Sequence, residues 1–218
     1  MGLHAIDEAK RCLNCKKPRC REGCPINTPI PQMIQMFLGG EMSDAAETVF
    51  EIREKIGGIL RYGIPEFRLP KSILDRYYVK MRELGIKFRP NFALGGSTGI
   101  QDLLKDGYDA VFIGTGTWRP YKLNIPGETF GNVHYGINYL NNPDVYDLGE
   151  RMVVIGAGNA AMDVARTAIR KGSQYVTVYS VTEVPAASPK EVEYAMIDGV
   201  QFEFLQTAIE IKDDGLVV

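Results

Sequence analysis

The chain has 218 residues, of which 45% are hydrophobic and 24% are charged, and its formal net charge is −2. This composition is typical of a globular protein that buries a core, and the length allows one large domain or two smaller ones. The nearly balanced charge argues against the basic surface of a nucleic-acid-binding protein, so we expect no nucleic-acid partner. No apolar run approaches the roughly 18 residues that cross a bilayer, and residues 1–10 lack a signal-peptide core. We therefore expect a cytoplasmic protein without a membrane partner.

The first part of the chain, residues 1–50, predicts a small helical unit. Helices are expected over residues 6–13, over residues 32–38 and from residue 45 toward residue 56. Ser43 and Asp44 suit the cap of the third helix.

The middle of the chain changes character after Gly57-Gly58. A helix is expected over residues 70–84, a short strand over residues 86–89 and another short helix over residues 101–105. Residues 108–113 are apolar and run into Gly114-Thr115-Gly116, a pattern typical of a buried parallel strand.

The last third has the clearest pattern. Strands are expected over residues 151–155, 175–180 and 200–205, and helices over residues 159–170 and 189–197. This β-α-β-α-β order predicts an α/β fold with a Rossmann-type parallel sheet. Residues 208–212 and 216–218 then flank an Asp-Gly sequence, which favours a hairpin.

A glycine turn, Gly156-Ala157-Gly158-Asn159-Ala160-Ala161, joins the first strand of this unit to its first helix. Gly156 permits a tight turn, Gly158 lets the backbone approach a pyrophosphate, and Ala161 allows close packing of the helix on the sheet. The helix start offers free N–H groups to the phosphates. The motif predicts a nicotinamide-dinucleotide site; the alternative is a packing turn without a ligand.

The choice between NAD and NADP depends on the loop after the second strand. An acidic residue there binds the ribose 2′-hydroxyl of NAD, whereas arginine binds the 2′-phosphate of NADP. This loop contains Glu183 and no arginine. Glu183 is therefore a candidate ribose ligand that favours NADH, unless it is only a solvated carboxylate.

All four cysteines of the chain, Cys12, Cys15, Cys20 and Cys24, lie within one short segment, and Pro25 follows the last. Four thiolates at this spacing, ending in Cys-Pro, are typical of an iron–sulfur cluster. Zinc takes the same ligands, and uncoordinated thiols are the third possibility. No acid–base pair or nucleophile is evident, because His4 and His134 lack a supporting motif.

These motifs, in this order, resemble the small (beta) subunit of glutamate synthase and the related NAD(P)H-dependent, ferredoxin-linked flavoprotein oxidoreductases. The likeness extends over nearly the whole chain. The matching segments are residues 8–25, 57–70, 108–116, 124–128 and 154–163.

The resemblance implies a helical cysteine-cluster domain at residues 1–56, a partial FAD-type domain at residues 57–127 and an NAD(P)-binding Rossmann domain at residues 128–218. It implies that the four cysteines hold a 4Fe-4S cluster and that Gly156, Gly158, Asn159 and Ala160 contact the dinucleotide. Gly114, Thr115 and Gly116 would lie where flavin and nicotinamide meet. Electrons would pass from NAD(P)H through flavin and cluster to a large glutamate synthase-type subunit or a ferredoxin-like acceptor.

The chain departs from this family where the FAD-binding glycine fingerprint is expected, because residues 50–55 pass directly from the helical unit to the Gly-Ile-Pro segment. FAD is expected from the family although its fingerprint is absent here. Two alternatives to an electron-transfer oxidoreductase follow, a dinucleotide-binding module without catalysis and a truncated family member.

Overall fold

The computed structural model describes Lys10, Asn14, Gln35 and residues 48–218. Residues 57–74 and 113–218 form one compact unit, and residues 48–56 and 75–112 belong to the other. Among the described residues, no helix combines the length and the apolar character needed to cross a membrane.

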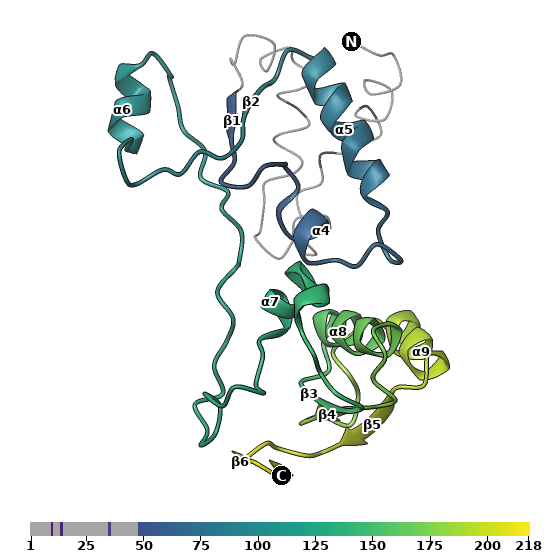
Figure 1. Cartoon of the computed structure of the whole chain (residues 1–218). Coiled ribbons are helices and arrows are strands. Elements are labelled where there is room, and N and C mark those ends of the chain that lie inside the picture. Colours follow the sequence, from purple (N-terminus) through teal and green to yellow (C-terminus); the bar gives the residue numbers. More distant parts are fainter. Residues whose placement is uncertain (1–9, 11–13, 15–34, 36–47) are drawn as a thin grey trace. The chain divides into compact units, whose positions relative to one another are not determined.

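The larger unit is built on a parallel sheet of three strands, β3 (Arg151–Ile155), β4 (Tyr175–Ser180) and β5 (Gln201–Phe204), in the order β3-β4-β5. Helices α8 (Asn159–Arg170) and α9 (Pro189–Ile197) connect the strands and cover one face of the sheet (Figure 1). The predicted Rossmann-type α/β arrangement is confirmed, and the predicted bounds of β3, α8, β4 and α9 agree with the structure.

The core of this unit forms where α8 meets the sheet. Along β4, alternate residues are buried, and Val176 and Val178 are fully shielded from solvent. Met162, Ala165 and Ala168 follow one another at helical spacing on α8 and are equally shielded. Small alanines let the helix approach the strands closely, so β-branched residues fill the space between the layers.

The predicted hairpin is also confirmed, because β6 (Glu210–Lys212) and β7 (Gly215–Val217) pair antiparallel. Three short helical segments of this unit, α4 (Gly58–Tyr62), α7 (Gly136–Asn141) and the 3-10 turn η1 (Pro143–Val145), were not expected from the sequence. α7 packs against α8 and buries Tyr139, and this burial raises the pKa of Tyr139 to about 12.

The other unit contains β1 (Thr48–Phe50) and β2 (Lys87–Arg89), which pair in parallel, and helix α6 (Ile100–Lys105). Helix α5 (Lys71–Glu83) begins in residues 57–74 and ends in this unit. The Phe50 ring packs near those of Phe92 and Tyr108, with centroid distances of 4.8 and 5.9 Å. α5, β2 and α6 confirm the elements predicted over residues 70–84, 86–89 and 101–105.

Two predicted elements are wrong. The helix expected from residue 45 toward residue 56 is instead strand β1 followed by a bend, because Thr48, Val49 and Phe50 pair with β2. Residues 108–113 form no strand, and Phe112 is 82% exposed. A strand needs a neighbour for its backbone groups, and no described strand pairs with these residues. The helices expected over residues 6–13 and 32–38 lie mostly outside the described residues.

Candidate functional site

The glycine turn lies at the carboxyl edge of the parallel sheet, between β3 and α8. The Gly156 N–H donates to the Tyr179 carbonyl over 2.9 Å, which continues the β3–β4 pairing by one residue. Gly156 has φ 103°, a left-handed conformation that disfavours side chains, whereas Gly158 has φ −84° and ψ 175°. The backbone conformation therefore requires glycine at position 156. At position 158 the backbone conformation is compatible with other residues.

The space beside both glycines is open. A Cβ atom built on Gly156 or Gly158 would meet no atom within 4 Å. No side chain caps the start of α8, where Gly158 is the N-cap residue. The N–H groups of Asn159 and Ala160 belong to the first turn, where a helix has no acceptors of its own. The turn thus has the room and the donors that a pyrophosphate needs.

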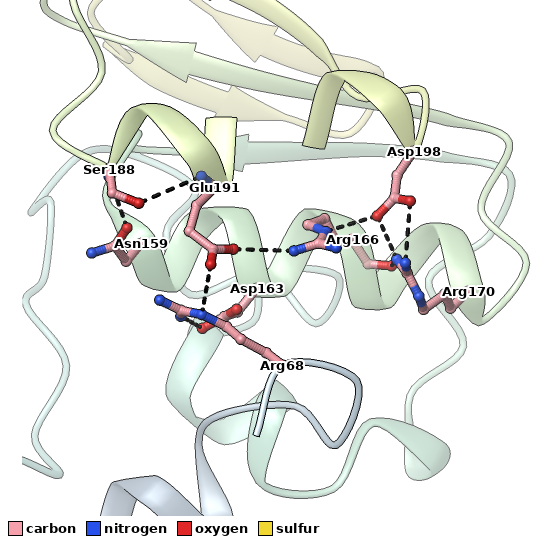
Figure 2. Close-up of polar contacts among 8 residues, drawn as sticks. All are labelled: Arg68, Asn159, Asp163, Arg166, Arg170, Ser188, Glu191 and Asp198. Atoms are coloured by element: carbon pink, nitrogen blue, oxygen red, sulfur yellow. Dashed lines mark hydrogen bonds and ion pairs between the residues drawn. The ribbon is translucent and has the colours of Figure 1, made fainter. Parts of the chain in front are cut away.

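The loop between β4 and α9 is attached to this turn at two points. The Ala187 N–H donates to the Ala157 carbonyl over 2.9 Å, and the Ser188 N–H donates to Asn159 Oδ1, also over 2.9 Å (Figure 2). The side chain of Asn159 therefore holds the loop that carries Glu183. Glu183 itself is exposed just beyond the end of β4, on the side where a Rossmann fold recognises ribose.

Gly114, Thr115 and Gly116 are exposed in a stretch without helix or strand, and no hydrogen bond found in residues 48–218 joins them to the glycine turn. Cys12, Cys15, Cys20 and Cys24 lie outside the described residues. A cavity of about 570 Å³ lies in the smaller unit beside Phe50 and Tyr108, and none of the predicted site residues that the structure describes lines it.

Along α8, α9 and the segment before α5, three arginines and three acidic residues alternate (Figure 2). Arg68 lies 2.6 Å from Asp163 and 3.1 Å from Glu191. Arg166 lies 3.1 Å from Glu191 and 2.7 Å from Asp198, and Arg170 lies 2.6 Å from Asp198. We call this set the ion-pair network; its members are Arg68, Asp163, Glu191, Arg166, Asp198 and Arg170.

The acidic residues of the network respond to their surroundings in opposite ways. Asp163 is only 3% exposed, so burial raises its pKa, and the Arg68 guanidinium opposes that rise. Its Oδ1 atom has no hydrogen-bond partner among the described residues. Asp198 is more accessible, and hydrogen bonds from Arg170 and then Arg166 lower its pKa. Arg68 is thus the main group that favours the ionised form of Asp163, whereas burial disfavours it.

The sequence motifs did not indicate the ion-pair network. One signal was present, since Asp163 and Arg166 are the charged residues of an otherwise uncharged stretch of α8 in which residues 162–168 are all buried. A buried charge requires a partner. The partner of Asp163 is 95 residues away in the sequence, so the pairing was beyond local analysis.

A glycine turn at the carboxyl edge of a parallel sheet is the place where Rossmann folds bind dinucleotides. A family model described as pyridine nucleotide-disulphide oxidoreductase matches residues 65–218, and the chain belongs to this family. A second model, described as dihydropyrimidine dehydrogenase domain II, 4Fe-4S cluster, matches residues 2–59, which include all four cysteines.

Individual relatives agree with this assignment. The chain is 37% identical over 185 residues to the glutamate synthase [NADPH] small chain of Halomonas elongata, covering 78% of this chain and 39% of the relative. It is 36% identical over 188 residues to the putative oxidoreductase AegA of Escherichia coli, covering 78% of this chain and 28% of the relative. The chain therefore spans less than half the length of these curated relatives.

Solved structures support the fold. A structure of FprA from Mycobacterium tuberculosis superposes with a TM-score of 0.65 at 21% identity, covering 79% of this chain and 57% of that one. FprA in complex with NADPH gives a TM-score of 0.63 at 22% identity, covering 77% and 54%. At these identities the likeness establishes the arrangement of the elements alone.

The lowered pKa of Asp198 predicts an acid-sensitive contribution to stability. A carboxyl whose pKa is lower in the folded state stabilises the fold above its ordinary pKa, near 3.8, and this contribution is lost as the pH falls below that value. At neutral pH, Asp198→Asn should lower the free energy of unfolding by about 1–3 kcal/mol, since it removes charge-assisted hydrogen bonds. Urea unfolding from pH 7 to pH 3 should show this deficit shrinking at the acid end.

The control is Asp109→Asn, because Asp109 is exposed and the substitution removes the same negative charge. It should unfold like the unmodified chain at every pH. A deficit for Asp198→Asn that stays constant down to pH 3 would contradict the assignment.

Proposed function

We propose that this chain binds NAD(P)H at its glycine turn and takes part in NAD(P)H-dependent electron transfer of the glutamate synthase small-chain type. The observation that carries the proposal is the open turn, where Gly158 leaves space beside an uncapped start of α8. In this arrangement Gly156 shapes the turn and the N–H groups of Asn159 and Ala160 donate to the pyrophosphate. Bound NAD(P)H supplies a hydride, while the protein orients it.

For the dinucleotide, we propose NADH as the better ligand. Glu183 is exposed beyond β4, and the loop of residues 181–187 contains no arginine. A carboxylate there accepts hydrogen bonds from the ribose hydroxyls and repels a 2′-phosphate. The glutamate synthase small chains are named for NADPH, so the nucleotide preference of this chain would differ from theirs.

For the onward path of electrons, the proposal assigns Cys12, Cys15, Cys20 and Cys24 to a 4Fe-4S cluster, in line with the family model that matches residues 2–59. It keeps the domain limits at residues 56/57 and 127/128 and places Gly114, Thr115 and Gly116 near a flavin. The acceptor would be a large glutamate synthase-type subunit or a ferredoxin-like protein. The cytoplasm is the proposed location.

The second candidate is a dinucleotide-binding module without catalysis. Two observations favour it: the sequence lacks an FAD-binding fingerprint, and residues 108–116 lie outside any strand, with Phe112 exposed. A module of this kind would bind NADH and dock on a partner, but the nicotinamide would have no electron acceptor within the chain.

Binding is tested with the whole chain by titrating NADH and NADPH and following nicotinamide fluorescence. Gly158→Val should weaken NADH binding at least about tenfold, since the new side chain fills the space for the pyrophosphate while the backbone tolerates it. The control is Gly131→Val, which adds the same volume in an exposed segment with open space around it. Equal affinity of the Gly158 variant and the unmodified chain would contradict the site.

Electron transfer is tested by the visible spectrum of protein purified without oxygen, before and after NADH is added. The proposal predicts flavin and iron–sulfur absorption that bleaches with NADH. A colourless protein that still binds NADH would favour the module. A colourless protein that binds neither nucleotide would contradict both functions.

A further inference from the structure

The ion-pair network joins α8 and α9 to a segment far away in the sequence, residues 57–71, which belongs to the same compact unit. Arg68 is the only member of the network outside α8 and the segment 189–198. Its guanidinium reaches Asp163 on α8 and Glu191 on α9 at once, through Nη1 and Nε (Figure 2). One side chain therefore bridges both helices that bear on the dinucleotide site.

The loop that carries Arg68 is held by its own hydrogen bonds. Lys71 Nζ donates to the carbonyl of Leu60 over 2.9 Å, to that of Leu69 over 3.2 Å and to that of Ile64. Both carboxylate oxygens of Glu66 accept from the Lys71 N–H. A loop closed in this way presents Arg68 in one orientation, which reduces the entropy lost when the ion pairs form.

The neighbour of Arg68 adds a second contact with α8. The Phe67 ring lies 4.1 Å from the Arg170 guanidinium carbon and 4.8 Å from that of Arg166. Both distances fall within the range of cation–π attraction. The loop thus contacts α8 along more than one turn, and the contact nearest the glycine turn is that of Arg68 with Asp163.

A short path leads from Arg68 to the turn. Asp163 lies one helical turn beyond Asn159 on α8. Glu191 lies in the first turn of α9, where its N–H donates to the N-cap Ser188 Oγ over 3.4 Å. The Ser188 N–H in turn donates to Asn159 Oδ1. Holding Asp163 and Glu191 together therefore holds the starts of α8 and α9 together, and with them the loop that carries Glu183.

We propose that Arg68 is a positioning residue of the dinucleotide site, which fixes the start of α9 and the Glu183 loop against the glycine turn by bridging Asp163 and Glu191. This inference rests on the proposed binding of NAD(P)H. Arg68 itself touches neither the turn nor the loop of residues 181–188; it acts through the two carboxylates.

The reason is electrostatic. Without Arg68, the carboxylates of Asp163 and Glu191 would face each other with side chains that are 4% and 14% exposed. Two partly desolvated like charges repel, and Glu191 already acts to raise the pKa of Asp163. Arg166 still pairs with Glu191, so Glu191 and the start of α9 would move toward Arg166 and away from the glycine turn.

The test compares NADH affinity and hydrogen–deuterium exchange for the whole chain and its Arg68 variants. Arg68→Gln should weaken NADH binding about five- to tenfold, the lower part of the range for coupling between two sites. Exchange should rise in residues 181–191 and 156–160 and stay unchanged in β3 and β4. Arg68→Lys should recover most of the affinity, because it keeps the positive charge. The control is Arg76→Gln, which removes an exposed arginine on α5.

A purely structural role is separated by a double variant. Arg68→Gln/Asp163→Asn removes the unpaired buried charge and so restores stability, but it lacks the bridge to Glu191 and should still bind NADH weakly. If the double variant or Arg68→Gln binds NADH like the unmodified chain, or if exchange rises uniformly over the sheet, the positioning role is overturned while the proposed function stands. If the unmodified chain binds neither NADH nor NADPH, the proposed function fails and the inference fails with it.

Discussion

The middle of helix α8 is buried, and the charged residues buried with it must be paired by neighbouring side chains. Residues 162–168 are all buried, so the helix has an apolar side toward the sheet and also encloses Asp163 and Arg166. Enclosed charges destabilise a fold unless they are paired. Arg68, Glu191 and Asp198 provide the partners, and in doing so they fix α9 and the loop of residues 57–71 around the helix. The start of α8 is left uncapped and open, and that is the part suited to a ligand.

The sequence was sufficient where the determining interactions are local. The bounds of β3, α8, β4 and α9 follow from apolar spacing, from glycines at the turns and from Ser188 and Pro189 at the start of α9. The sequence was insufficient where pairing with a distant segment determines the secondary structure. Apolar residues at helical spacing around residues 48–50 predicted a helix, but residues 48–50 pair with β2. The apolar residues 108–113 pair with none of the described strands. Secondary-structure propensity is a property of one segment, whereas a β-sheet forms only when two segments pair.

The candidate site was likewise predictable from the sequence only in part. The spacing of Gly156 and Gly158 predicted an open turn at the sheet edge, and the structure has one there. The role of Asn159 in holding the β4–α9 loop and the bridge made by Arg68 required coordinates, since these contacts join residues 29 and 95 positions apart. A motif identifies where a phosphate fits, while the long-range polar contacts determine how firmly the surrounding loops are held.

Binding of NAD(P)H at the glycine turn of residues 156–161 can be followed in amide NMR spectra of the nitrogen-15-labelled chain, recorded during titration with NADH. We expect saturable shifts of the Gly156, Gly158, Asn159 and Ala160 resonances, followed by those of the Glu183 loop, with little change in residues 75–105. Absence of shifts at the turn, or shifts confined to the smaller unit beside Phe50 and Tyr108, would contradict binding at the turn.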